Sequence, residues 1–156
     1  MADIINDGMT KVAYVATISD TAAPTVAELN AGVALEGYLT EFAHDSSNES
    51  VDTTALSSTY ETALPGRRTL ETSLTLKFQG ATAEPYSTLA GTPDGYLVVR
   101  RFVASTTAWT AGQTVEVHTV QYGQRRMMPA SANEVLKFSV DVAHTAEPVE
   151  AATVAA

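Results

Sequence analysis

The chain contains no cysteine among its 156 residues. Disulfide frameworks, thiolate nucleophiles and zinc–thiolate sites all require that residue, so the sequence excludes the three together. Packing or assembly must therefore supply the stability that cross-links give to many other small proteins.

Positive charge is scarce as well. Charged residues make up 17% of the chain, below the usual quarter, and 9 Lys and Arg face 18 Asp and Glu, which gives a formal net charge of −9. Affinity for DNA comes from basic side chains that replace the counterions of phosphates, so this charge argues against a DNA-binding role. Acidity also serves solubility, and by itself it indicates nothing more.

Long apolar runs are missing too. None approaches the roughly 20 residues that span a bilayer. The first residues, MADIINDGMTKV, carry two aspartates and no basic stretch before an apolar run, which is unlike a secretory signal. We therefore expect a protein that is made in the cytoplasm and enters no membrane.

Catalytic motifs are absent from the sequence. It has no GxSxG elbow, phosphate-binding loop, HExxH or dinucleotide fingerprint. His44, His118 and His144 lie far apart along the chain with no metal-ligand spacing, so we expect neither a metal nor a cofactor.

One catalytic alternative uses carboxylates. Glu71, Glu116 and Asp141 could form a glycosidase-like pair if their strands were neighbours. Outward acidic residues on strands are far more often part of a solvated face, so we expect no enzyme.

What the sequence does contain is β-structure. In Thr69–Phe78 the apolar residues Leu70, Leu74, Leu76 and Phe78 alternate with polar ones, which predicts a half-buried strand. Similar patterns predict further strands at 11–18, 35–42, 96–103, 114–122 and 133–144. Within 114–122 the apolar phase slips by one near His118, which predicts a β-bulge.

Helices are few. Thr25 and Glu28 have capping-box spacing and Gly32 follows as a stop, which predicts one or two turns at 25–31. A second short helix is predicted at 84–89, with Pro85 in its first turn.

In the remaining segments the apolar residues follow neither the period of a helix nor that of a strand. Residues 43–68 are rich in Ser, Thr, Asp and Asn and predict one long loop, which is unusual unless a partner orders it. We expect a flexible arm at 1–10, a single domain at 11–146 and a disordered tail at 147–156. The fold class is mainly β, a β-sandwich or partly open barrel with one or two short helices, a long inter-strand loop and flexible termini.

Two arginine pairs stand out in so acidic a chain: Arg67 with Arg68, and Arg125 with Arg126. Loop charges of this kind are often simply solvated. Arginine is also favoured where carboxylates are met in a bidentate manner, so each pair could instead dock onto an acidic surface of an identical subunit.

Several separated blocks resemble, in one order, the major tail proteins of siphophages that infect actinobacteria. They are DTAAPTVAELNAGVALEGYLT, VDTTALSSTYETALPGR, SLTLKF, GYLVVRR with AWTAGQTVEVHTVQYG, and PASANEVLKFSVDV, and they span about residues 11–146. Some members carry cysteine where this chain has Tyr38, Ser57 or Tyr122, so no thiol chemistry carries over.

The resemblance implies a tail tube protein of the virion that assembles into stacked hexameric rings around the channel for phage DNA. It also implies tape-measure, tail-tip and tail-terminator proteins as partners, with DNA only in transit. Two other classes stay open, namely a capsid decoration or head–tail completion protein and a β-sandwich binding module.

Candidate residues follow from this interpretation. The arm at 1–10 and the long loop at 43–68 are both expected bridges between rings. Within the loop the contacts are expected through Val51, Leu56 and Leu64, and the arginine pairs are further candidates for contacts between subunits. Glu71 and Asp141, on the non-core faces of the two clearest strands, are candidates for the bore, because an acidic lining lets DNA slide. The alternative is that these faces meet outer solvent, since Lys77 and Lys137 share them.

Overall fold

The computed structural model describes residue 3 and residues 5–156. Within these residues the chain forms nine strands and one short helix. Their bounds are β1 Thr10–Val15, α1 Val26–Ala31, β2 Val33–Ala34, β3 Leu39–Asp52, β4 Ala63–Lys77, β5 Asp94–Arg101, β6 Thr114–Tyr122, β7 Arg126–Met127, β8 Lys137–His144 and β9 Val149–Thr153.

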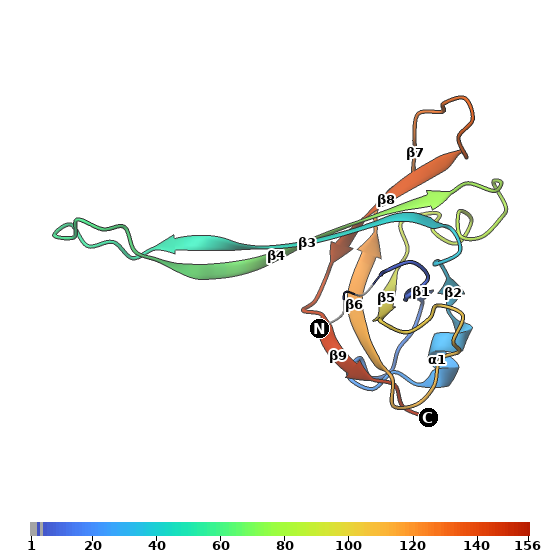
Figure 1. Ribbon diagram of the computed structural model, residues 1–156, viewed down its shortest axis with the longest axis horizontal. Coiled ribbons are helices and arrows are strands. Elements are labelled where there is room, and N and C mark those ends of the chain that lie inside the picture. Colours follow the sequence, from blue (N-terminus) through green and yellow to red (C-terminus); the bar gives the residue numbers. More distant parts are fainter. Residues whose placement is uncertain (1–2, 4) are drawn as a thin grey trace.

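All strands belong to one antiparallel sheet with the order β2-β1-β5-β6-β8-β4-β3. In addition, β7 pairs with β8, and β9 pairs with the first half of β6. The strands curl into a body from which β3 and β4 project as a long hairpin (Figure 1). The predicted class, mainly β with a short helix, is confirmed.

Three central strands are buried on both faces. Along β5, Leu97 and Val99 enter one apolar core, and Val98 enters a second core on the opposite face. Strands β1 and β6 are divided in the same way. Helix α1 and strand β9 cover the second core through Leu29 and Ala152.

This double burial explains the slip in β6. Val115 and Val117 belong to the second core, whereas Val120 and Tyr122 belong to the first. The pairing of β6 with β5 is regular. An irregularity does occur in the pairing with β9, between Val115 and Val117, where two steps along β6 match three along β9.

Helix α1 begins as predicted. The Thr25 hydroxyl accepts a hydrogen bond from the Glu28 backbone N–H at 3.3 Å, and the Glu28 carboxylate accepts one from the Thr25 N–H at 2.9 Å. Ser19 also donates to that carboxylate, and together these bonds lower the pKa of Glu28 to about 2. The helix ends at Gly32, where a Cβ would lie 2.6 Å from the Tyr14 carbonyl oxygen.

The prediction of a loop at 43–68 is wrong. These residues form most of the β3–β4 hairpin, paired from Leu39↔Leu76 to Asp52↔Ala63, with a short turn region at 53–62. Most of the projecting part is exposed on both faces, so its residues show no alternation of apolar and polar side chains. Cross-strand backbone hydrogen bonds hold it together instead.

The predicted disorder at 147–156 is also wrong. Strand β9 pairs with β6, and Ala152 and Val154 are almost fully buried. The Val154 carbonyl accepts a hydrogen bond from the Gly112 N–H, and Ala155 bridges to Thr25. Small apolar residues give a weak sequence signal, yet they fit closely against β6.

Three further segments differ in detail. The predicted helix at 84–89 lies in a run of turns and is not an α-helix. The predicted strand at 35–42 is interrupted by a turn, so that β2 ends at Ala34 and β3 starts at Leu39. Of the predicted arm, residues 1, 2 and 4 lie outside the described residues, and Gly8 accepts a hydrogen bond from Ser105. In the described part, no helix is long and apolar enough to cross a membrane.

Candidate assembly surfaces

Most residues of the β3–β4 hairpin are exposed. Strand β8 pairs with β4 only from Thr72 to Lys77. From Glu71 back to Ala63, β4 pairs with β3 and with no third strand among the described residues. Both edges of the projecting ribbon therefore offer backbone groups for pairing.

Apolar side chains gather at the end of this ribbon. Val51 and Leu64 are direct cross-strand partners and are 50% and 61% exposed. Leu56 and Tyr60, in the turn, are more exposed still. We call these four residues the hairpin tip. Sequence reasoning named the first three, and the aromatic ring within a polar segment was the signal for Tyr60.

The hairpin tip is acidic as well as apolar. Glu49, Asp52 and Glu61 lie beside it, and the chain has no Lys or Arg between Lys11 and Arg67. Exposed apolar groups rimmed by charge are typical of a surface that binds another protein.

A second exposed apolar patch lies on the β7–β8 hairpin, at another end of the molecule (Figure 1). Its exposed members are Met127, Met128, Val135 and Leu136, and we call them the β7–β8 tip. Four of the nine basic residues of the chain accompany it: Lys77, Arg125, Arg126 and Lys137. The loop itself carries a single acidic residue, Glu134. Sequence analysis named the arginines here but missed the apolar residues.

Of the four residues in the two arginine pairs, three contact other residues of the chain. Arg68 donates to the Ser46 hydroxyl and to the Glu150 carboxylate. The Arg125 guanidinium lies 3.9 Å from the centre of the Tyr86 ring and donates to the Tyr86 carbonyl.

Arg126 forms an ion pair with Asp141, and both side chains are mostly exposed. Arg67 is exposed on the hairpin. Arg68, Arg125 and Arg126 are thus held in defined positions, and the side chains of Arg68 and Arg126 remain partly exposed.

The two candidate bore residues share one face of β4 and β8. Glu71 lies opposite Asp45 on β3, and Asp141 lies opposite Ser73 on β4. Direct partners across antiparallel strands point to the same side, so Asp45, Glu71 and Asp141 form an acidic face at the base of the hairpin. Arg126 partly neutralises it at Asp141.

The structure does not bring the three candidate carboxylates together as an acid–base pair. Glu116 accepts hydrogen bonds from Arg101, at 2.8 and 3.3 Å. Burial opposes ionisation of Glu116, but the adjacent His118 and Arg101 outweigh burial and lower its pKa to about 2. A general acid needs a raised pKa, so Glu116 does not suit that role.

The histidines, far apart in sequence, do come together. The ring centres of His44, His118 and His144 lie 5.1 to 5.8 Å apart. The Thr72 hydroxyl oxygen lies 2.8 Å from His44 Nδ1 and 2.8 Å from His144 Nε2. We call these four residues the imidazole cluster. No group of three or more His, Asp or Glu in the described residues has an arrangement suited to a metal ion.

The described chain thus has a β-rich body and two exposed apolar tips, one beside acidic residues and the other beside basic residues. The chain belongs to the phage tail tube protein family, which matches residues 1–156. That family is structural, so the chain is a component of phage tails and not an enzyme, as the sequence analysis expected.

Comparison with solved structures shows the same fold at low sequence identity. One similar chain is from a 6-fold symmetrised cryo-EM structure of the anti-feeding prophage baseplate, with TM-score 0.57, 10% identity and coverage of 96% of this chain and 97% of the other. Another is from the tail of an empty GTA particle with C6 symmetry, with TM-score 0.53, 14% identity and coverage of 97% and 100%. A comparison with curated proteins gave no match.

Proposed function

We propose that this chain is the major tail protein of a long-tailed phage, resembling those of siphophages that infect actinobacteria, and that it forms stacked hexameric rings. The rings build the hollow tail tube through which phage DNA passes. The observation that carries this proposal is the family match over the whole chain. The sixfold symmetry of the two similar assemblies supports the ring size.

The physics of open edges supports assembly. A strand edge that faces solvent can pair with another chain, and a ring satisfies such edges at every subunit boundary. Stacking of ring on ring is a head-to-tail contact, which does not close and therefore extends as a filament.

Inter-ring contact is assigned in this proposal to the hairpin, with Val51, Leu56 and Leu64 at its end. The hairpin tip of one subunit is apolar and acidic, and the β7–β8 tip of a second copy is apolar and basic. Opposite charges steer the two together, and the apolar groups lose water on contact. Arg125 and Arg126 lie on the receiving side, and Arg67 and Arg68 on the donating hairpin.

The bore needs a surface that does not hold DNA. Six subunits at −9 give a formal −54 per ring. Glu71 and Asp141, with Asp45 beside them, are the proposed lining, since acidic walls repel phosphates and allow the genome to slide.

The remaining partners follow from this role. Tape-measure, tail-tip and tail-terminator proteins would set the length and the ends of the tube. The protein would be made in the host cytoplasm and end in the virion.

Electron microscopy of the purified protein, alone and with a tail-tip initiator, tests the proposal. We expect hollow tubes of sixfold rings. A protein that stays monomeric under both conditions would contradict it, and decoration of capsids or isolated rings would favour the alternative structural roles.

A further inference from the structure

The imidazole cluster lies where the projecting hairpin leaves the body. His44 is on β3 and Thr72 on β4, whereas His118 and His144 are on the body strands β6 and β8. Along β4, Thr72 is also the first residue that pairs with β8, where it lies opposite Val142. The cluster therefore joins the base of the hairpin to the body at the point where sheet pairing ends.

Its hydrogen bonds fit neutral rings. The Thr72 hydroxyl has one proton, so it donates to one imidazole and accepts from the other. If both rings were protonated, His44 and His144 would each aim an N–H at the same oxygen. Two positive charges would then lie within a ring-to-ring distance of 5.8 Å.

The surroundings also disfavour charge. Thr72 and His118 are 4% and 2% exposed, and neither His118 nitrogen has a hydrogen-bond partner. Burial and then His118 lower the pKa of His44, and burial, His118 and His44 lower that of His144 to about 4.

Charged groups face the cluster from each neighbouring element. Glu116 on β6 lies 3.6 Å from His118 Nε2 and favours a proton on His44, but it is also paired with Arg101 of β5. Arg68 on β4 disfavours that proton and is itself paired with Glu150 of β9. The Glu116 carboxylate is thus shared between the cluster and an arginine, and a further carboxylate, that of Glu147, lines the same pocket as His144.

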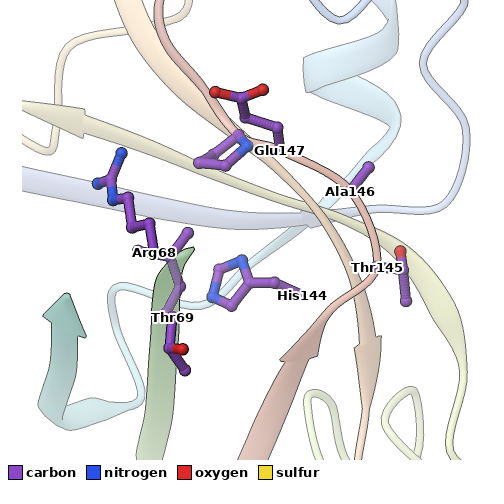
Figure 2. Close-up of a pocket in the computed structure, with 8 residues that line it drawn as sticks. Arg68, Thr69, His144, Thr145, Ala146 and Glu147 are labelled. Carbon is purple, nitrogen blue, oxygen red and sulfur yellow. The ribbon is translucent and has the colours of Figure 1, made fainter. Parts of the chain in front are cut away.

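Water can reach the cluster from one side. His144 lines a pocket of 480 Å³ together with Arg68, Thr69 and the segment 145–148 (Figure 2). Protons therefore have a route to the buried rings without unfolding of the body.

We propose that the imidazole cluster is a pH-sensitive latch, which holds the base of the β3–β4 hairpin on the body at neutral pH and loosens it in acid. The sign follows from the ordinary histidine pKa of about 6.5 in an opened state. Above that pH both states are neutral and the latch is closed. Below it the opened state takes up protons that His44 and His144 resist in the closed cluster, so closure weakens as pH falls.

The first test uses the unmodified monomer. The chain has only three histidines, all in the cluster, so every imidazole signal in a nitrogen-15 NMR titration reports on it. We expect His44 and His144 to titrate clearly below 6.5, with faster amide exchange at the hairpin base as they do. Titration of both rings at the ordinary value would overturn the proposal.

The second test removes the titration and keeps the hydrogen bonds. An Asn amide can replace Nδ1 and a Gln amide can replace Nε2, so the variant is His44→Asn with His144→Gln. Between pH 7 and pH 5 the urea midpoint of the parent should fall. The midpoint of the variant should fall by no more than half as much. An unchanged fall in the variant would contradict the latch.

Measuring the urea midpoint only above pH 5 separates the effect of the histidines from that of carboxylates such as Glu116. The pKa of Glu116 is lowered, so it takes up its proton at lower pH. As a matched control, Thr72→Val removes the shared hydroxyl but leaves all three rings, so its pH dependence should persist.

The consequence for assembly rests on the proposed function: tubes of the parent should dissociate in mild acid more readily than tubes of the double variant. The two monomer tests stand even if no tubes form.

Discussion

Val51 and Leu64 face each other across the β3–β4 hairpin, and at least half of each side chain is in solvent. A cross-strand apolar pair normally stabilises a sheet by packing on a core. Here no core lies beneath the pair, so its apolar surface is available to another molecule.

Replacing Val51 and Leu64 with Asp should therefore block assembly and leave the monomer folded. Burying an aliphatic side chain contributes about 1.5–3 kcal/mol, so losing two should raise the concentration needed for tubes by more than tenfold. Sedimentation and electron microscopy measure this. Thr106→Asp, an exposed change on the body, is the control. Normal tubes from the double variant would remove the hairpin tip from the interface.

Hydrogen exchange should distinguish the free hairpin from the assembled one. In the monomer, residues 45–52 and 63–71 form a two-stranded ribbon, which is marginal in water, so their amides should exchange faster than those of β5. In tubes the same amides should be protected. Equal exchange in both states would argue against contacts through the hairpin.

The acidic face can be tested by charge reversal. Glu71→Lys with Asp141→Lys should permit tube assembly and slow DNA ejection at low salt, because lysines in the bore would hold phosphates. The slowing should fade as salt is raised. Glu84→Lys, in an exposed turn, serves as the control. Ejection at the parental rate would place Glu71 and Asp141 outside the bore.

The C-terminal segment 149–154, which contains β9 and Val154 directly after it, should matter for stability even though the sequence suggested a disordered tail. Val154 is 2% exposed in the second core, so Val154→Asp buries an unpaired charge and should cost about 3 kcal/mol or more of unfolding free energy. Urea denaturation monitored by Trp109 fluorescence reports the change. Ala156→Asp, at an exposed position, should have little effect. Equal midpoints for the two variants would mean that the C-terminal segment 149–154 does not hold the fold.

The sequence predicts those elements whose signals are local. Alternation marks β8 because its inner residues Phe138, Val140 and Val142 face a core and its outer ones face solvent. The capping box marks α1 because Thr25 and Glu28 satisfy each other's backbone groups.

Other features depend on distant parts of the chain. The hairpin at 43–68 has solvent on both faces and hence no period, and β6 changes cores midway. The imidazole cluster needs β6, β8, β4 and β3 to lie in that order in the sheet, and no spacing within the sequence reports that. The exposed tips could be suspected from Leu56 or Met127 in polar surroundings, but their separation and opposite charge required the fold.

The projecting ribbon also has a mechanical consequence. From Glu71 outward, only two strands of the described chain run side by side, and at roughly 3.3 Å per residue they reach on the order of 30 Å from the body. A ribbon two strands wide and one strand thick bends readily out of its plane and resists bending within it. In the proposed tube, contacts between rings that run through such ribbons would let the tail curve under load while each ring keeps its shape.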